Sequence, residues 1–530
     1  METKIKKKSS RKLRKWHKWV GIFFTFFLFM FAVSGIFLNH RRAISSVDIP
    51  RSLLHSDYQY DNWNNGSFKN SIKLSPDSVL IYGNNGIWLT DSKHSFFKPF
   101  SYGMKKGADN RTVNRVVRTL DNDLYAVTTF DLYKQENGHE AWQSLSHLIT
   151  SKERFTDLVL YGDSLVLMTR SHIFISEAPF VKFERRELLT PEGYKKEVSL
   201  FRTMWTLHSG ELFGITGKVI VDLIGILVII LCVTGVILMF CPSIIRRKKR
   251  KDKDVSSHVR LMKNSLKWHN KLGAWFLFLF LLTCVTGMFL RPPLLIAIVR
   301  TKTKPMPGSV LNSPNPWFDK LRCLRYDAGS NDWILYSSEG FYRMQTLDAV
   351  PQKIIQSPPV SVMGVTVMEP VRVVNEPVSG LDTLEAASAR TDEHYWIVGS
   401  FSGIYYWDRQ TGDSFDFYTG EKYFRKRGGM PTFSNAVNGY SNDFENKQIV
   451  FEYSRGARVN GESGFATMPE TFRQGRMSLW HLCLEIHVGR IYSPLLGIVT
   501  DLFAFLSGVL FLIILLTGYI VYRRHFRRKK

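Results

Sequence analysis

The chain has 530 residues and a formal net charge of +25 at neutral pH, which by itself would suggest a nucleic-acid partner. The basic residues, however, gather within a few residues of long apolar segments. This placement is typical of the cytoplasmic ends of membrane spans, so it argues against nucleic-acid binding and indicates an integral membrane protein.

Four apolar segments are long enough to cross a membrane as helices. They lie at residues 20–38, 219–240, 272–290 and 495–522 and are almost free of charge. Each has about twenty residues or more, as a hydrocarbon core of about 30 Å requires. The first segment has the basic start of a signal peptide, but no small-residue cleavage site follows it, so we expect a retained anchor.

Basic clusters flank these segments on one side of the membrane if the spans alternate. They lie at residues 4–18, 246–253 and 523–530, and the positive-inside rule places them, with both termini, in the cytoplasm. We therefore expect this order: a basic N-terminus at 1–18, a first span at 19–40, the first half of an outer β-domain at 41–205, a histidine motif with the second span at 206–242, a basic loop at 243–268, a third span at 269–292, the second half of the outer β-domain at 293–480, a histidine motif with the fourth span at 481–522, and a tail at 523–530.

The sequence contains an internal repeat that joins the first span to the third and the second to the fourth. The segment 16–21 (Trp-His-Lys-Trp-Val-Gly) opens the first span, and 268–273 (Trp-His-Asn-Lys-Leu-Gly) opens the third. The motif Leu-His-x-Gly or Ile-His-x-Gly precedes each of the other two spans, and each of these two spans ends in Thr-Gly. Because each copy holds two spans, both copies enter the membrane the same way round and form parallel repeats.

The two outer segments have the pattern of β-structure. Short runs of β-branched and aromatic residues recur between turn residues, as at 78–89 and 333–342. Six such units, three in each half, predict one six- to eight-bladed propeller built from both halves. Two separate sandwich-like β-domains are the alternative. The expected fold class is membrane α+β, with a four-helix transmembrane bundle made of two parallel repeats and outer all-β domains.

Four histidines occupy repeated positions at the membrane edges. Alternation of the spans places His17 and His269 near the cytoplasmic edge and His208 and His487 near the outer edge. A neutral imidazole on each side of a porphyrin is a common way to hold haem iron. Residues 21 and 273, both glycines, follow one helical turn after their histidines and would leave room for a flat ring. The alternative is that these histidines are interfacial anchors.

Together these motifs resemble the PepSY-associated transmembrane family of bacterial inner-membrane proteins. The resemblance rests on the Trp-His-x-x-x-Gly opening, the Ser/Thr-Gly pair late in the same span, and the Leu-His-x-Gly that precedes a span ending in Thr-Gly; it covers all four spans. It implies a link to iron uptake and, for some members, haem-dependent reduction of ferric siderophores. Carried over by position, it implies that the ligands of the haem iron are His17, His269, His208 and His487, with Gly21 and Gly273 beside the cofactor.

The chain departs from the family in its outer segments, where we find no PepSY module. It also has no glycine-rich nicotinamide- or flavin-binding motif on the cytoplasmic side, so electrons would come from a donor such as quinol. Our hypothesis is an inner-membrane protein with two haem b groups that reduces a ferric, siderophore-like complex or a redox partner in the periplasm. The alternative is a cofactor-free, membrane-anchored propeller that binds or assembles other proteins. Cys323 and Cys483 would both be external and could form a disulfide.

Overall fold

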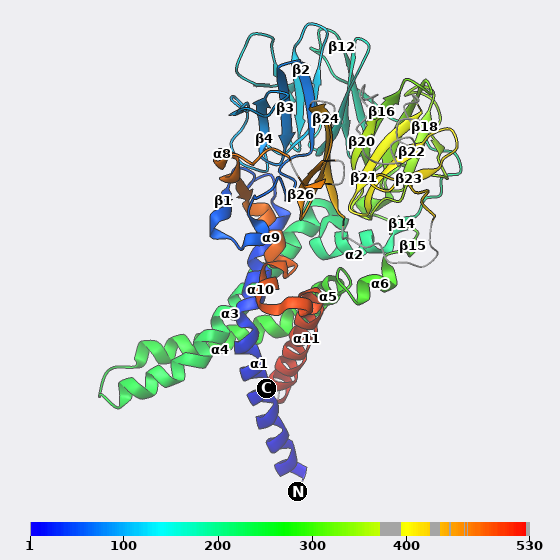
Figure 1. The fold of residues 1–530 in the computed structure, drawn as a ribbon. Coiled ribbons are helices and arrows are strands. Elements are labelled where there is room, and N and C mark those ends of the chain that lie inside the picture. Colours follow the sequence, from blue (N-terminus) through cyan, green and yellow to red (C-terminus); the bar gives the residue numbers. More distant parts are fainter. Residues whose placement is uncertain are drawn as a thin grey trace. The chain divides into compact units, whose positions relative to one another are not determined.

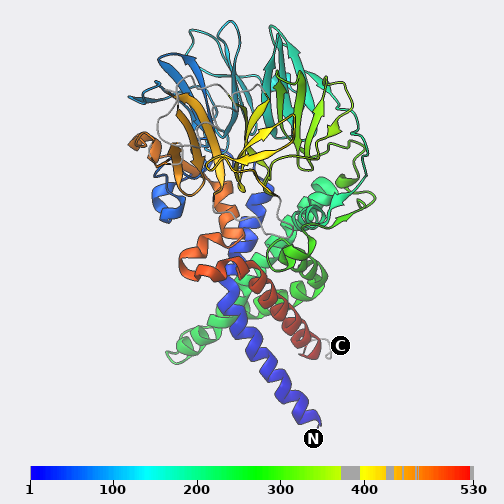
Figure 2. The same ribbon diagram turned by 45° about the vertical axis from the view of Figure 1, so that its right-hand side comes forward.

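The computed structural model describes residues 2–371, 394–424, 435–444, 447–459, 462–463 and 465–525. The chain forms two compact units, drawn in Figure 1 and from a second direction in Figure 2. The helical unit consists of Met1–Ile44, Lys195–Pro314 and Trp480–Lys530, and the β-unit of Ser45–Tyr194 and Asn315–Leu479. Each unit therefore takes segments from both halves of the chain.

Three helices of the described chain are long and apolar enough to cross a membrane: α1 (Glu2–Asn39), α3 (Gly214–Lys249) and α11 (Thr500–His525). The third apolar segment is divided between α4 (Ser256–Trp275) and α5 (Leu277–Met288), which meet at a bend of 64°. Counted as one broken span, this pair raises the number to four. The protein is thus a membrane protein with several apolar helices.

The helices of this unit pack around a small apolar core and leave other apolar side chains on the outside. α1 packs against α3 and α11, α3 against α4, and α11 against α5. Phe280 is fully buried in the core, whereas Phe23, Ile215 and Ile498 are exposed by 73, 83 and 96%. Surface of this kind is unfavourable in water and favourable in lipid.

Short helices connect the spans to the β-unit. They are α2 (Leu200–Ser209), α6 (Leu294–Ile298), α9 (Leu479–His487) and α10 (Ser493–Leu496). Gly210 ends α2 in the left-handed conformation with φ of 79°, and Gly489 has φ of 85° after α9. A glycine is favoured at both positions because other residues rarely adopt this conformation.

The first half of the chain contributes three antiparallel four-stranded sheets to the β-unit, and the strand order in each follows the sequence. The first sheet is β2 (Asn70–Ser75), β3 (Ser78–Gly83), β4 (Gly86–Thr90) and β5 (Phe97–Pro99). The second is β6 (Val113–Arg118), β7 (Leu124–Thr128), β8 (Leu132–Gln135) and β9 (Gln143–Ser144). The third is β10 (Phe155–Tyr161), β11 (Ser164–Thr169), β12 (Ile173–Glu177) and β13 (Glu184–Arg186).

The second half of the chain contributes three more sheets of the same design. The fourth sheet is β16 (Leu321–Asp327), β17 (Asp332–Ser337), β18 (Gly340–Met344) and β19 (Gln352–Lys353). The fifth is β20 (Val365–Pro370), β21 (Tyr395–Ser400), β22 (Gly403–Asp408) and β23 (Ser414–Asp416). The sixth is β24 (Val437–Phe444), β25 (Lys447–Glu452), β26 (Gly456–Val459) and β27 (Glu462–Ser463).

The six sheets close into a ring, which we call the β-ring. The first strand of each sheet contacts the first strand of the next, and β24 returns to β2, where the Tyr440 N–H donates to the carbonyl of Lys69 at 3.1 Å. Six apolar cores lie between neighbouring sheets around the ring. This is the arrangement of a six-bladed β-propeller with three blades from each half, whereas two separate sandwiches would not close in this way.

Two further strand pairs also join the two halves of the chain. β1 (Asp48–Pro50) pairs with β28 (Arg476–Ser478), and β14 (Val198–Ser199) pairs with β15 (Lys302–Thr303). In both pairs one strand comes from each half.

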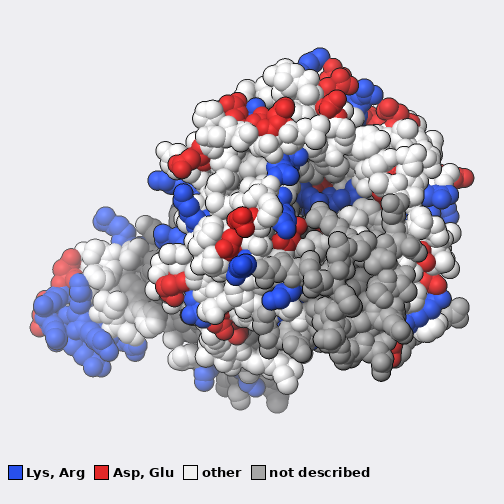
Figure 3. All heavy atoms as spheres, turned by 45° about the horizontal axis from the view of Figure 1, so that its top comes forward, with Lys and Arg blue, Asp and Glu red and all other residues white. Residues whose placement is uncertain are grey.

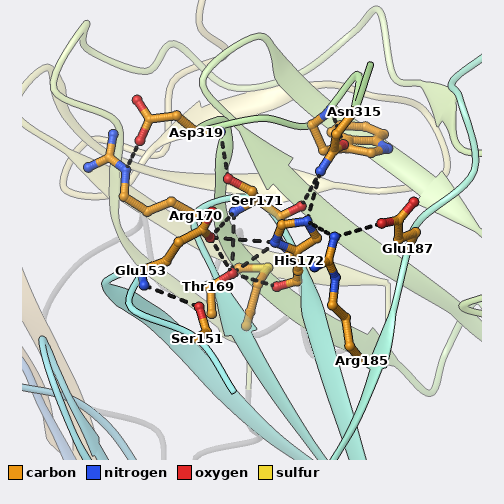
Figure 4. Close-up of polar contacts among 12 residues, drawn as sticks. Ser151, Glu153, Thr169, Arg170, Ser171, His172, Arg185, Glu187, Asn315 and Asp319 are labelled. Carbon is orange, nitrogen blue, oxygen red and sulfur yellow. Dashed lines mark hydrogen bonds and ion pairs between the residues drawn. The ribbon is translucent and has the colours of Figure 1, made fainter. Parts of the chain in front are cut away.

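A polar joint connects the third and fourth sheets where the chain returns to the β-unit (Figure 4). Asn315 donates to the carbonyl of Ser171 at 2.9 Å, and the Asp319 N–H donates to the Ser171 hydroxyl at 2.9 Å. His172 lies between Arg185, which donates to its Nε2 at 2.6 Å, and the carboxylate of Glu153, 3.7 Å from Nδ1. These contacts fasten the second half of the chain to the first.

The five cysteines are all buried free thiols, and Cys323 and Cys483 belong to different units. The disulfide that their external positions made possible is therefore not formed. Burial raises the pKa of the Cys323 thiol, which favours its neutral form.

Candidate functional site

The structure brings the four repeated histidines together as two pairs within the helical unit. The ring centres of His17 on α1 and His269 on α4 lie 6.2 Å apart, with the ring planes inclined by 75°. The ring centres of His208 on α2 and His487 on α9 lie 6.0 Å apart, with an inclination of 55°. Each pair contains one histidine from each half of the chain.

Each histidine is oriented by a hydroxyl and a carbonyl on a neighbouring helix. Nδ1 of His208 lies 3.0 Å from the carbonyl of Thr283 and 3.3 Å from the hydroxyl of Thr286. That hydroxyl donates to the carbonyl of Leu282 at 2.8 Å, so its oxygen is the acceptor toward the imidazole. Because both neighbours accept, Nδ1 must carry the proton, and the lone pair of the neutral ring is on Nε2.

The other three histidines repeat this arrangement. Their hydroxyl partners are Thr517 for His17 at 3.3 Å, Thr234 for His269 at 2.9 Å and Ser34 for His487 at 3.1 Å. The carbonyl three residues before the hydroxyl is the second acceptor: Ile514 at 3.1 Å for His17 and Phe31 at 3.1 Å for His487, with Leu231 for His269. All four rings therefore have the same tautomer, with Nε2 directed away from the bonded carbonyl.

The glycine after each hydroxyl residue gives the ring its space. A Cβ placed on Gly518 or Gly287 would lie 2.8 Å from the ring carbon Cε1 of His17 or His208, and one on Gly35 would lie 3.1 Å from His487. At Gly235 the corresponding distance to His269 is 3.7 Å, an ordinary contact. We call each hydroxyl residue and the glycine after it the seat of its histidine. A Cβ would clash with the ring at Gly287 and Gly518 and would press against it at Gly35.

Each histidine contacts a seat that belongs to the other half of the chain. His17 and His208 of the first half rest on α11 and α5 of the second half. His269 and His487 of the second half rest on α3 and α1 of the first half. Neither half alone provides both a histidine and its seat.

This donor set fits haem iron. An iron bound by two imidazole nitrogens at about 2 Å each, with about 1 Å more from nitrogen to ring centre, separates the ring centres by about 6 Å. The observed separations are 6.2 and 6.0 Å. Nδ1 bonded to a carbonyl with Nε2 left for the metal is also the usual state of a ligating histidine. The described residues contain no group of three or more His, Cys, Asp or Glu side chains suited to a bare metal ion.

The two pairs lie toward opposite ends of the apolar core. On α1, eighteen residues separate His17 from Gly35, the seat of His487, or about 27 Å at 1.5 Å per residue. The same number separates His269 from Gly287, the seat of His208, across the bend between α4 and α5. A hydrocarbon core is about 30 Å thick.

The two glycines expected beside the cofactor do not seat a histidine. A Cβ on Gly21 would meet no atom within 4 Å, and one on Gly273 would meet only Leu231, at 3.9 Å. The close contacts with the histidine rings are made instead by the glycines of the Ser/Thr-Gly pairs. The sequence repeat made those pairs visible but did not indicate that they contact the histidines.

Several other polar groups of the helical unit form ion pairs with one another. His40 is half exposed and bonds Asp222 at 2.8 Å, and Arg291 lies 3.9 Å from Asp501. Glu485, two residues before His487, accepts from Arg490 at 2.8 Å. His40 is therefore engaged with a carboxylate and is not part of either histidine pair.

Comparison with known proteins supports the family suggested by the motifs. No curated protein matches the chain. Among solved structures, an ancestral GH74 enzyme is 8% identical with a TM-score of 0.30, covering 74% of this chain and 35% of its own. YCF48 from Cyanidioschyzon merolae is 8% identical with a TM-score of 0.32, covering 74% and 94%. PorZ, a surface component of the type-IX secretion system of Porphyromonas gingivalis, is 9% identical with a TM-score of 0.22, covering 72% and 43%.

At these scores the similarities support no conclusion about fold or function, and the chain spans less than half of the GH74 enzyme and of PorZ. The family model of the PepSY-associated TM region, by contrast, matches residues 14–525, almost the whole chain. That range includes all four paired histidines and both segments of the β-ring. The protein is therefore a member of the PepSY-associated TM family.

Proposed function

We propose that this chain is a haem b protein that passes electrons across the inner membrane. The observation that carries the proposal is the presence of two histidine pairs whose ring centres lie 6.2 and 6.0 Å apart, one toward each end of the apolar core. Four rings that served only as interfacial anchors would have no need to face one another at this distance.

The chain's own residues have three tasks in this proposal. His17 and His269 bind one iron through Nε2, and His208 and His487 bind the other. The carbonyls that accept from Nδ1 keep each ring in the required tautomer and raise the basicity of Nε2. When bound, haem supplies an iron centre that takes up and releases one electron at a time.

Apolar side chains between the two pairs exclude water from the interior of the helical unit. Leu227, Phe280 and Leu515, from α3, α5 and α11, are all buried there. A low dielectric around paired neutral imidazoles favours binding of a metal centre whose charge the macrocycle partly neutralises.

The basic segments set the direction that we propose. The helix-terminal run Arg246, Arg247, Lys248 and Lys249 ends α3, and the positive-inside rule places it in the cytoplasm. Both termini then lie in the cytoplasm and the β-ring in the periplasm. Electrons would enter at His17 and His269 from a donor such as quinol and leave at His208 and His487 toward a ferric, siderophore-like complex or a redox partner.

Visible spectroscopy of the purified full chain tests the proposal. We expect a Soret band, sharp α-bands after dithionite reduction, and two haems per chain. Replacing both members of one pair, as in His208→Ala with His487→Ala, should remove one haem and leave the other. The matched control is His40→Ala, because His40 lies near the outer edge but bonds Asp222.

Two results would contradict the proposal. One is a folded, colourless protein from haem-replete cells. The other is a haem content that stays the same when both histidines of a pair are replaced by alanine. A colourless protein would leave the membrane-anchored β-ring as a binding or assembly module, which is the alternative function.

A further inference from the structure

Arg291 stands just beyond the end of α5, the helix that provides the seat of His208. It follows Gly287 by four residues, which is about one helical turn. The Arg291 side chain is 21% exposed, and its Nε is buried without a hydrogen-bond partner in the described chain. A buried donor that is left unpaired costs free energy, which a bound acceptor would recover.

The ion pair of Arg291 does not account for this burial. Its partner among the described residues is Asp501, which lies 3.9 Å away and has a side chain that is 82% exposed. An ion pair with a carboxylate in water contributes little to stability. A second acceptor would therefore account for the buried nitrogen better than Asp501 does.

Basic residues that only mark the end of a span extend their charges into water. The loop between α3 and α4 is an example: most of its Lys and Arg side chains, at residues 246–253, are exposed, and they lie at the left of Figure 3. Arg291 differs from them, because part of its guanidinium group stays inside the helical unit.

A second arginine lies near Arg291 and adds to the positive charge there. Arg490 follows His487 by three residues, and its charge acts electrostatically on Arg291. The Nε of Arg490 donates to Glu485 at 2.8 Å, so this buried carboxylate already has a cation of its own. Repulsion between two guanidinium groups is strong where water is scarce, and a further anion beside Arg291 would offset it.

The sequence repeat shows that the fold itself does not require a cation at this place. Asn39 is the equivalent residue on α1, four residues after Gly35, and it donates to Asp222 at 3.0 Å. Asp222 and Asp501 are also equivalent, since each follows its paired histidine by fourteen residues. A neutral amide thus meets the carboxylate in one half of the chain, whereas Arg291 brings a charge in the other.

We propose that Arg291 binds a propionate of the haem held between His208 and His487. Haem carries its two carboxylates on one edge of an otherwise apolar ring. A guanidinium group beside the seat of His208, with only an amide at the equivalent place of the other half, favours one orientation of that edge through charge-assisted hydrogen bonds. The inference rests on the proposed haem function and names the residue that orients this cofactor.

Haem and haem dimethyl ester, which differ in the charge of the two carboxylates, test the inference in the full chain. His17→Ala with His269→Ala leaves the pair His208–His487 as the binding site, and titration of this haem-free protein is followed by the Soret band. We expect it to bind haem more tightly than the ester. Arg291→Gln should reduce this preference roughly tenfold or more, as expected when a charge-assisted hydrogen bond is lost.

Redox titration of the chain as purified with both haems gives a second readout. Without Arg291 the propionate charge is uncompensated, and a nearby negative charge favours the ferric form over the ferrous form. Arg291→Gln should therefore move one of the two reduction steps to a more negative potential and leave the other in place. Arg300→Gln is the matched control, because Arg300 belongs to the same unit but is exposed, and it should move neither step.

Arg291→Lys guards against misfolding, since it keeps the charge and should keep most of the preference for haem over its ester. The inference is overturned if Arg291→Gln retains the full preference, or if neither reduction step moves in that variant. Two haems per chain together with either result would leave the haem function standing and remove only the role of Arg291. A colourless unaltered chain would contradict the haem function itself, and the inference with it.

Discussion

Each of the four histidine rings is positioned by a hydroxyl, a carbonyl and a glycine on a neighbouring helix. The Ser or Thr hydroxyl and the carbonyl three residues earlier fix the proton on Nδ1, and the glycine that follows admits the ring. The sequence spacing is the same at all four seats because one turn of helix brings these groups to the same face. Ring orientation is thus encoded in a dipeptide that lies on another helix.

Gly287→Ala should disturb the pair His208–His487, whereas Gly235→Ala should be tolerated. The new methyl group would lie 2.8 Å from His208 in the first variant and 3.7 Å from His269 in the second. Overpacking of this kind costs about 1–3 kcal/mol. Thermal unfolding and haem content of the two purified variants provide the measurement, and equal behaviour would contradict the seating described here.

At the scale of elements, the sheets of the β-ring are joined by local polar contacts that are sensitive to charge. The joint between the third and fourth sheets is the clearest case, because the chain leaves the β-unit after Tyr194 and returns at Asn315. Arg185 donates to Nε2 of His172 there, which requires a neutral acceptor nitrogen.

We expect the β-unit to lose stability as the pH falls below about 6.5. Burial, aided by Arg185 and opposed by Glu153, lowers the pKa of His172 from its ordinary value of 6.5. The unfolded chain therefore binds a proton more readily than the folded one, so this contribution is present above pH 6.5 and is lost as the pH falls through the folded pKa.

Thermal unfolding between pH 5 and 8 measures this dependence. His172→Gln should flatten it, and the same change at the exposed His139 should leave it unaltered. A profile that is identical in the His172 variant and the unaltered chain would show that the joint does not titrate in this range.

Some elements were predictable from sequence and others were not. The six sheets of the β-ring followed from turn-spaced runs of β-branched and aromatic residues, and the repeat placed one histidine from each half at the same membrane edge. The bend between α4 and α5 was not predictable, since residues 274–277 are apolar and contain neither proline nor glycine. The β-bulges in the first strands of five sheets also gave no signal, because a single polar residue inside a strand looks the same whether it is bulged or paired.

At the scale of the whole molecule, each unit is a joint product of the two halves. The β-ring takes three sheets from each half, two strand pairs cross between them, and every histidine seat is exchanged. The exchanged seats could not be read from sequence, because helical periodicity shows which face is apolar but does not show which helix covers it.

Two separately translated halves should therefore assemble. A break in the loop at residue 253, between α3 and α4, interrupts no sheet and no histidine seat. We expect co-expressed fragments 1–253 and 254–530 to co-purify through an affinity tag on either one. The first fragment alone should aggregate, because the apolar faces that the second fragment covers stay exposed. Separate elution of well-folded fragments would contradict this expectation.

The exchange of seats has a consequence for how the protein is made. While the ribosome is still translating the basic loop, the nascent chain already holds His17 and His208, yet neither has its partner ring or its glycine seat. The seat of His17 is at Thr517 and Gly518, on α11. The two histidine pairs and their seats are complete only after α9 and α11 have been synthesised and inserted. If the pairs bind haem as proposed, a chain that lacks α11 cannot hold the cofactor between His17 and His269 on their seats, so loading of that site is a late step.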